Sequence, residues 1–148
     1  MSGVTSIAVA GLCAGVLDIS ATAILVRAQG ISLERLLQMI ASGAFGPSAF
    51  RDGKRAAATG LFFHFLIAFV AAALYYSASR SLAGLNHHPV LSGILYGTAV
   101  HLVMSRIVLP LSAAPKREFS AKSFLIQWVI HILCVGLPIA LVVGYFAD

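Results

Sequence analysis

Four ionisable side chains stand inside long hydrophobic stretches of the sequence, one in each stretch: Asp18, His64, His101 and His131. An ionisable group within a membrane span costs free energy, so such residues usually face a bundle interior and serve a function. A carboxylate with imidazoles can relay protons, hold a divalent metal or, through two histidines, ligate haem. The four residues are therefore the candidate functional site, a buried polar centre for a ligand or cofactor.

The composition predicts a membrane protein. Hydrophobic residues make up 59% of the 148 residues and charged residues only 10%, whereas a soluble domain carries about 25% charged residues. The apolar residues gather in four blocks, each near the roughly 20 residues that cross a bilayer as a helix. We expect spans at about 4–26, 58–79, 89–111 and 121–146. The prediction is one all-α domain, residues 1–148, forming an integral membrane four-helix bundle.

The net charge of +5 is distributed as a topology signal. Basic residues cluster in the first and third loops, while the second loop holds Arg80 alone. Basic loops stay in the cytoplasm, so both termini are expected on the outer side of the membrane. The cations indicate contact with lipid headgroups and not with nucleic acid. The expected headgroup contacts are Arg51, Lys54, Arg55, Lys116 and Arg117.

Two spans carry their ionisable residue on a stripe of small residues, the pattern that lets a neighbouring helix approach closely. The stripes are Gly11, Gly15, Asp18 and Thr22 in the first span and Gly93, Gly97, His101 and Ser105 in the third. At 1.5 Å of rise per residue, all four ionisable groups lie roughly 9–15 Å below the cytoplasmic surface. A closed bundle would bring them to a shared centre.

The first loop contains an amphipathic pattern over about 32–42. It is too short to span, so we expect an interfacial helix, with Ser32 as its N-cap and Gly43 as its end. Its apolar face is Leu33, Leu36, Leu37 and Ile40, and its polar face is Glu34, Arg35 and Gln38.

Two further features concern the second and fourth spans. Tyr75 and Tyr76 suit the outer membrane interface, where aromatic side chains gather. Pro138 cannot donate to the helix ladder, which frees the carbonyl of Cys134 and predicts a kink near mid-depth.

The polar centre admits several chemistries. His101 and His131 match in depth as axial ligands of haem b, and Arg106 lies where it could pair with a propionate or another anion, or extend to lipid phosphates. His64, His101, His131 and Asp18 are candidate ligands of a divalent metal. Quinone binding and a proton-coupled carrier of small solutes use the same groups.

A different class is a non-enzymatic accessory or interaction subunit of a larger membrane complex. The chain has no GxSxG and no HExxH motif, so nucleophilic and zinc-dependent hydrolysis find no support. Without a sizeable extramembrane domain, partners would be the lipid bilayer and another protein or a second copy within the membrane. This is the leading expectation, and ligand binding at the polar centre is the alternative.

Several strings together resemble an uncharacterised family of small four-span bacterial inner-membrane proteins. They are AGVLDISATAI, LLQMIASGAFG, GLFFHFLIAF, VLSGILYGTAV, IVLPLSA and HILCVGLPIAL. The resemblance covers nearly the whole chain. It implies the four-span fold and a bacterial origin, and it implies no particular activity.

Overall fold

The fold, seen in a computed structural model that describes residues 2–82, 84–116 and 118–147, is an all-α four-helix bundle. Within these ranges four helical segments are long and apolar enough to cross a membrane, and no strand occurs. They run over Gly3–Ala28, Gly53–Ser81, Pro89–Leu111 and Ala121–Tyr145. The predicted fold class is confirmed, and each predicted span lies within five residues of its observed helix ends.

The first two spans are single helices, α1 (Gly3–Ala28) and α3 (Gly53–Ser81). The third comprises α5 (Pro89–Val103), a π-helical segment (Met104–Val108) and α6 (Leu109–Leu111). The fourth comprises α7 (Ala121–Ile130), a second π-helical segment (His131–Gly136) and α8 (Leu137–Tyr145). The connections hold α2 (Leu33–Phe45), a 3₁₀ turn (Gly46–Phe50) and α4 (Gly84–His87).

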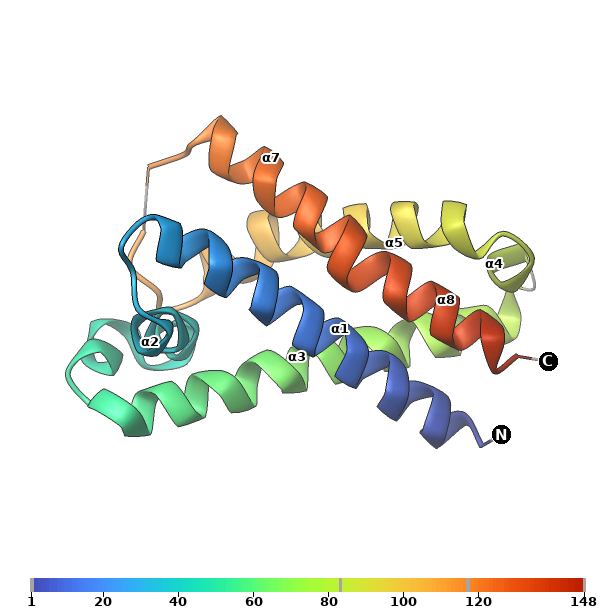
Figure 1. The fold of residues 1–148 in the computed structure, drawn as a ribbon, viewed down its shortest axis with the longest axis horizontal. Helices are drawn as coiled ribbons and strands as arrows, with labels where there is room; N and C mark the ends of the chain where they lie inside the picture. Colours follow the sequence, from blue (N-terminus) through green and yellow to red (C-terminus); the bar gives the residue numbers. More distant parts are fainter. Residues whose placement is uncertain (1, 83, 117, 148) are drawn as a thin grey trace.

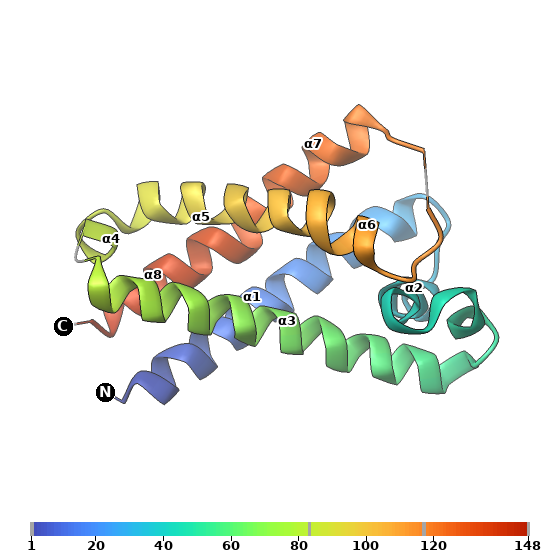
Figure 2. The ribbon, with the colours of Figure 1, turned by 180° about the vertical axis from the view of Figure 1, so that it is seen from behind.

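Figures 1 and 2 place both termini and α4 at one end of the bundle, and α2 with the α6–α7 connection at the other. The basic first and third loops therefore share an end, which we call the basic end. The end with both termini carries Arg80 near its loop.

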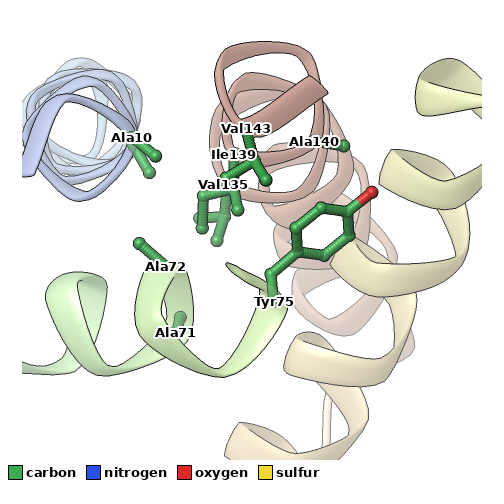
Figure 3. Packing of buried hydrophobic residues seen from close by; sticks show 9 residues of the cluster. Ala10, Ala71, Ala72, Tyr75, Val135, Ile139, Ala140 and Val143 are labelled. Carbon is green, nitrogen blue, oxygen red and sulfur yellow. The ribbon is translucent and has the colours of Figure 1, made fainter. Parts of the chain in front are cut away.

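The half of the bundle towards the termini contains an apolar core of mostly small and aliphatic side chains, which we call the dry core (Figure 3). Alanines let the helices approach, and a few larger side chains fill the remaining space. The cluster consists of Ala10, Ala14, Ala71, Ala72, Tyr75, Val135, Ile139, Ala140 and Val143.

Tyr75 lies in this core with 2% of its surface exposed, so its predicted place at the membrane interface is wrong. Its ring meets Tyr96 edge-on at 5.0 Å, and its hydroxyl donates to the Leu85 carbonyl at 3.4 Å. The Tyr96 hydroxyl donates to the Ala71 carbonyl at 2.6 Å, so the two tyrosines connect α3 to α5. A buried phenol is tolerated because its O–H finds an acceptor.

The glycine stripes mark two pairs of closely packed helices. Between α5 and the π-helical segment of the fourth span, a Cβ on Gly97 would lie 2.6 Å from the Ile132 Cα and 2.7 Å from the His131 carbonyl oxygen, so the backbones themselves are in contact. Between α1 and α3, a Cβ on Gly15 would lie 2.6 Å from the Phe65 ring, so the Phe65 side chain packs against the α1 backbone. The chain therefore forms two tightly packed helix pairs, α1 with α3 and α5 with the fourth span.

Both π-helical segments end two residues before a proline, Pro110 or Pro138. In an α-helix the proline ring would clash with the carbonyl four residues earlier. The wider turn of a π-helix moves this carbonyl away from the ring. The last amide before each proline donates to the carbonyl five residues earlier, Leu109 to Met104 and Leu137 to Ile132. In the fourth span, Pro138 is thus preceded by a widened helical turn that begins at His131.

The first-loop helix α2 begins as predicted, because the Ser32 hydroxyl accepts from the Arg35 amide at 3.1 Å. It continues past Gly43 to Phe45 and ends at Gly46, whose φ of +64° suits glycine. The expected polar face is wrong at Gln38, which is 6% exposed and donates to the Gly53 carbonyl at 3.2 Å. Helix α2 is therefore docked against the start of α3.

Candidate functional site

Three of the four predicted site residues line one cavity of about 190 Å³, which we call the polar chamber: Asp18 from α1, His64 from α3 and His131 from the fourth span. Apolar side chains make up most of its wall, including Ala14, Ala68 and Val135. The chamber lies on the basic-end side of the dry core, with which it shares Ala14, Ala71 and Val135. The structure thus places three of the four predicted residues at one cavity.

Asp18 and His64 face each other across the α1–α3 contact. The His64 Nδ1 lies 3.9 Å from the Asp18 Oδ2, beyond the 2.7–3.2 Å of an N–H···O hydrogen bond. The other ring nitrogen, Nε2, lies 2.8 Å from the Gly15 carbonyl oxygen. A carbonyl can only accept, so Nε2 carries the proton and a neutral His64 presents its Nδ1 as an acceptor.

Asp18 is only partly satisfied within the described structure. Its side chain is 18% exposed, and its Oδ1 is buried without a hydrogen-bond partner among the described residues. No Lys or Arg occurs among the described residues that line the chamber. A buried carboxylate without a full complement of donors is costly unless something pairs with it.

His131 enters the chamber at the start of the π-helical segment. Its Nδ1 donates to the Gln127 carbonyl at 2.7 Å, one turn back in α7. This bond fixes the tautomer of the neutral ring in the same way, with Nε2 as the acceptor.

His101 does not line the chamber. Its ring packs against His131, with centroids 5.2 Å apart, and edge-on against Phe124 at 4.5 Å. The residue is 3% exposed, and neither ring nitrogen has a hydrogen-bond partner in the described structure. The predicted centre of four residues is therefore wrong for His101, because the stripe of Gly93 and Gly97 turns this residue into the contact between α5 and the fourth span, against His131 and Phe124.

His101 instead lines a second cavity of about 550 Å³, which we call the side cavity, together with Arg106 and Lys116. The Arg106 guanidinium lies over the rings of Phe119 and Phe124, at 5.7 and 5.2 Å from their centroids. The Lys116 ammonium donates to the carbonyls of Leu109, Pro110 and Ser112, at 3.2, 2.7 and 2.9 Å, where α6 ends. These cations thus have defined local roles on this face.

A larger cavity of about 840 Å³, which we call the vestibule, adjoins the polar chamber at the basic end. It reaches Gln29 after α1, Ser112 after α6 and Lys122 near the start of α7. The two cavities share six lining residues: Thr22, Leu36, Ile40, Ile67, Met104 and Gln127. The chamber and this mostly apolar space, which extends to the loops, therefore adjoin across a shared wall.

The remaining predicted cations lie around the basic end. Arg51, Lys54 and Arg55 are exposed at the 3₁₀ turn and the start of α3. Lys116 is exposed in the third loop, and Arg117 lies outside the described residues. Exposed cations at the end of a bundle suit contact with anionic headgroups, which stays a prediction.

The predicted ligands fit neither haem b nor a divalent metal ion. Bis-histidine ligation needs a porphyrin plane between the two imidazoles, but the rings of His101 and His131 contact each other directly. Among the described residues, no three His, Cys, Asp or Glu side chains gather so that they could hold a metal ion.

Two groups that complete the site were not among the predicted site residues. Gln127 lines the chamber, the vestibule and the side cavity alike, and its place one turn before His131 on the same helix face was the available signal. The Gly15 carbonyl that fixes the His64 tautomer is a backbone group, which no side-chain pattern reveals. Comparisons with protein-family models, curated proteins and solved structures found no match to this chain.

Proposed function

We propose that this chain is a multi-pass membrane protein that binds a small molecule in the polar chamber, which the molecule enters through the vestibule. One observation carries the proposal: a cavity inside the bundle is lined by Asp18, His64 and His131 and adjoins a wider cavity at the basic end, with which it shares a wall. Ligand sites are typically concave and mostly apolar, with a few convergent polar groups. Ionisable residues in membrane spans mark such sites.

The distribution of charge supports an orientation. The basic end would face the cytoplasm and both termini the opposite side, in the inner membrane of a bacterium. The ligand would then reach the chamber from the cytoplasm or the inner leaflet, because the dry core lies on the side of the chamber towards the termini.

The chamber favours ligand binding over a purely structural use of the polar residues. Groups that only held helices together would satisfy one another, whereas the Asp18 Oδ1 has no partner in the described structure. The expectation of an accessory subunit and that of a proton-coupled carrier stay predictions.

Cysteine accessibility tests the proposal without knowledge of the ligand. In a background with Cys13→Ala and Cys134→Ala, Thr22→Cys lies on the wall shared by the chamber and the vestibule. Ile24→Cys, two residues on, is the matched control, because Ile24 is 73% exposed on the outer surface of the bundle. A charged, membrane-impermeant thiol reagent should label Thr22→Cys from the basic side only and leave Ile24→Cys unmodified. Equal failure to label both positions in detergent-solubilised protein would contradict an accessible chamber.

A further inference from the structure

The chamber presents hydrogen-bond acceptors to its ligand without matching donors. Because His64 Nε2 is committed to the Gly15 carbonyl, the neutral ring offers its Nδ1 lone pair towards Asp18. The carboxylate adds Oδ2, 3.9 Å from that nitrogen, while its Oδ1 is buried without a partner among the described residues. Two acceptors therefore face each other, and a proton held on Nδ1 could not bridge the distance by itself.

A group inserted between these acceptors must be a donor. A primary ammonium has N–H donors for both facing acceptors and a positive charge that matches the charge of the carboxylate. A quinone offers only carbonyl acceptors on its ring, so its head group would repeat the polarity of the site instead of complementing it. A carboxylate or phosphate ligand would add negative charge beside Asp18.

The space around the acceptors limits the size of the head group. The chamber holds about 190 Å³, about six times the roughly 30 Å³ that one water occupies in the liquid. The adjoining vestibule, of about 840 Å³, is lined largely by apolar side chains such as Leu25, Phe63 and Ile126. A ligand that fills both has a small polar head and an apolar body.

We infer that the ligand of the polar chamber is an amphiphilic primary amine, whose ammonium lies between Asp18 and His64 and whose apolar body lies in the vestibule. This inference rests on the proposed function and names its ligand class. Asp18 supplies the charge and one acceptor, Oδ2, His64 supplies the other, and the His64–Gly15 bond keeps the His64 lone pair turned towards the ligand.

The test is calorimetric titration of the purified full chain in detergent with four probes that share a six-carbon main chain, corrected by titration of detergent alone. The probes are hexylamine, hexyltrimethylammonium, hexan-1-ol and hexanoate. Hexylamine should bind about tenfold or more tightly than each of the others, because charge-assisted hydrogen bonds give about that factor. The quaternary ammonium keeps the charge but has no N–H, so it isolates the requirement for a donor.

Variants locate the site. Asp18→Asn should weaken hexylamine binding by about tenfold or more, because the neutral amide loses the charge-assisted bonds. Asp52→Asn, the same change at an exposed carboxylate before α3, should leave the affinity unchanged. Elution at the wild-type volume in size exclusion shows that each variant is folded, and the probe series on the wild-type chain does not depend on the variants.

The results that would contradict the amine differ from those that would contradict the chamber. Equal binding of hexylamine and hexyltrimethylammonium would overturn the donor requirement, and tighter binding of hexanoate would overturn the sign of the charge. Absence of binding by all four probes, with Thr22→Cys still labelled from the basic side, would reject the amine while the proposed chamber stands. Failure of the labelling itself would reject the chamber.

Discussion

The Nδ1 of His64 and the Oδ2 of Asp18 face each other at 3.9 Å, with no hydrogen bond between them, while the opposite nitrogen of His64 is fixed by the Gly15 carbonyl. The two side chains come from α1 and α3, and their meeting is a consequence of the glycine contact that brings these helices together. Four experiments follow from this arrangement and from its surroundings.

Asp18→Asn should raise the melting temperature of the ligand-free protein in detergent. The amide has the shape of the carboxylate but no charge, so the change relieves the cost of a buried ion with one unpartnered oxygen. A gain of about 1 kcal/mol corresponds to about 2–4 °C in a chain of this size. Thermal unfolding followed by circular dichroism measures it, with Asp52→Asn as the exposed control. A clear loss of stability would show that Asp18 holds the helices together.

His101→Leu should also stabilise the protein. The imidazole is 3% exposed and neither of its nitrogens has a partner in the described structure. Its burial therefore costs about 1–3 kcal/mol of desolvation that no hydrogen bond offsets. Leucine removes both polar atoms at a similar volume and keeps contact with Phe124. The matched control is His87→Leu at an exposed position of α4. A drop in the unfolding midpoint of His101→Leu beyond that of the control would mean that a ring nitrogen is bonded after all.

Gly97→Ala should disrupt the pairing of α5 with the fourth span. The added Cβ would lie 2.6 Å from the Ile132 Cα and 2.7 Å from the His131 carbonyl oxygen, and backbone atoms cannot move aside as a side chain can. Overpacking of this kind costs about 1–3 kcal/mol. Gly84→Ala is the control, because a Cβ there meets nothing within 4 Å. The comparison is the melting temperature of both variants, and equal values would contradict the close helix contact.

Reporter fusions check the proposed orientation. A reporter that is active only in the cytoplasm should be active when it is fused after Pro115, in the basic third loop, and inactive when it is fused to the C-terminus. An exporter-dependent reporter should give the opposite pattern at the same two sites. Reversal of both patterns would place the basic end, and with it the vestibule, on the outer side.

Much of the fold follows from local signals in the sequence. The spans are set by the length of the apolar stretches, and α2 starts at Ser32 because an N-cap bond needs only residues three apart. The end of α2 was missed because both Gly43 and Gly46 could stop a helix. The choice of Gly46 accompanies packing against α3 and the 3₁₀ turn that follows.

The site was predicted in part, and its error has one physical source. A stripe of small residues marks the side of a helix that meets its nearest partner, which is not always the side that faces the bundle centre. On α1 the stripe leads Asp18 to His64, and this contact borders the chamber. On α5 the same kind of stripe buries His101 against His131 and Phe124 instead. Which helices form pairs is decided by tertiary packing, so the stripe alone could not separate the two cases.

The polar chamber draws its walls from both tightly packed helix pairs, with Asp18 and His64 on one and Gln127 and His131 on the other. A molecule bound there would contact both helix pairs and link them at the basic end. Without it, the two pairs share mainly the alanine-rich contact near the termini. Ligand binding would therefore reduce local opening of the helices at this end. It would slow amide hydrogen exchange along the basic-end turns of α1 and α7, even where no residue of those turns contacts the ligand.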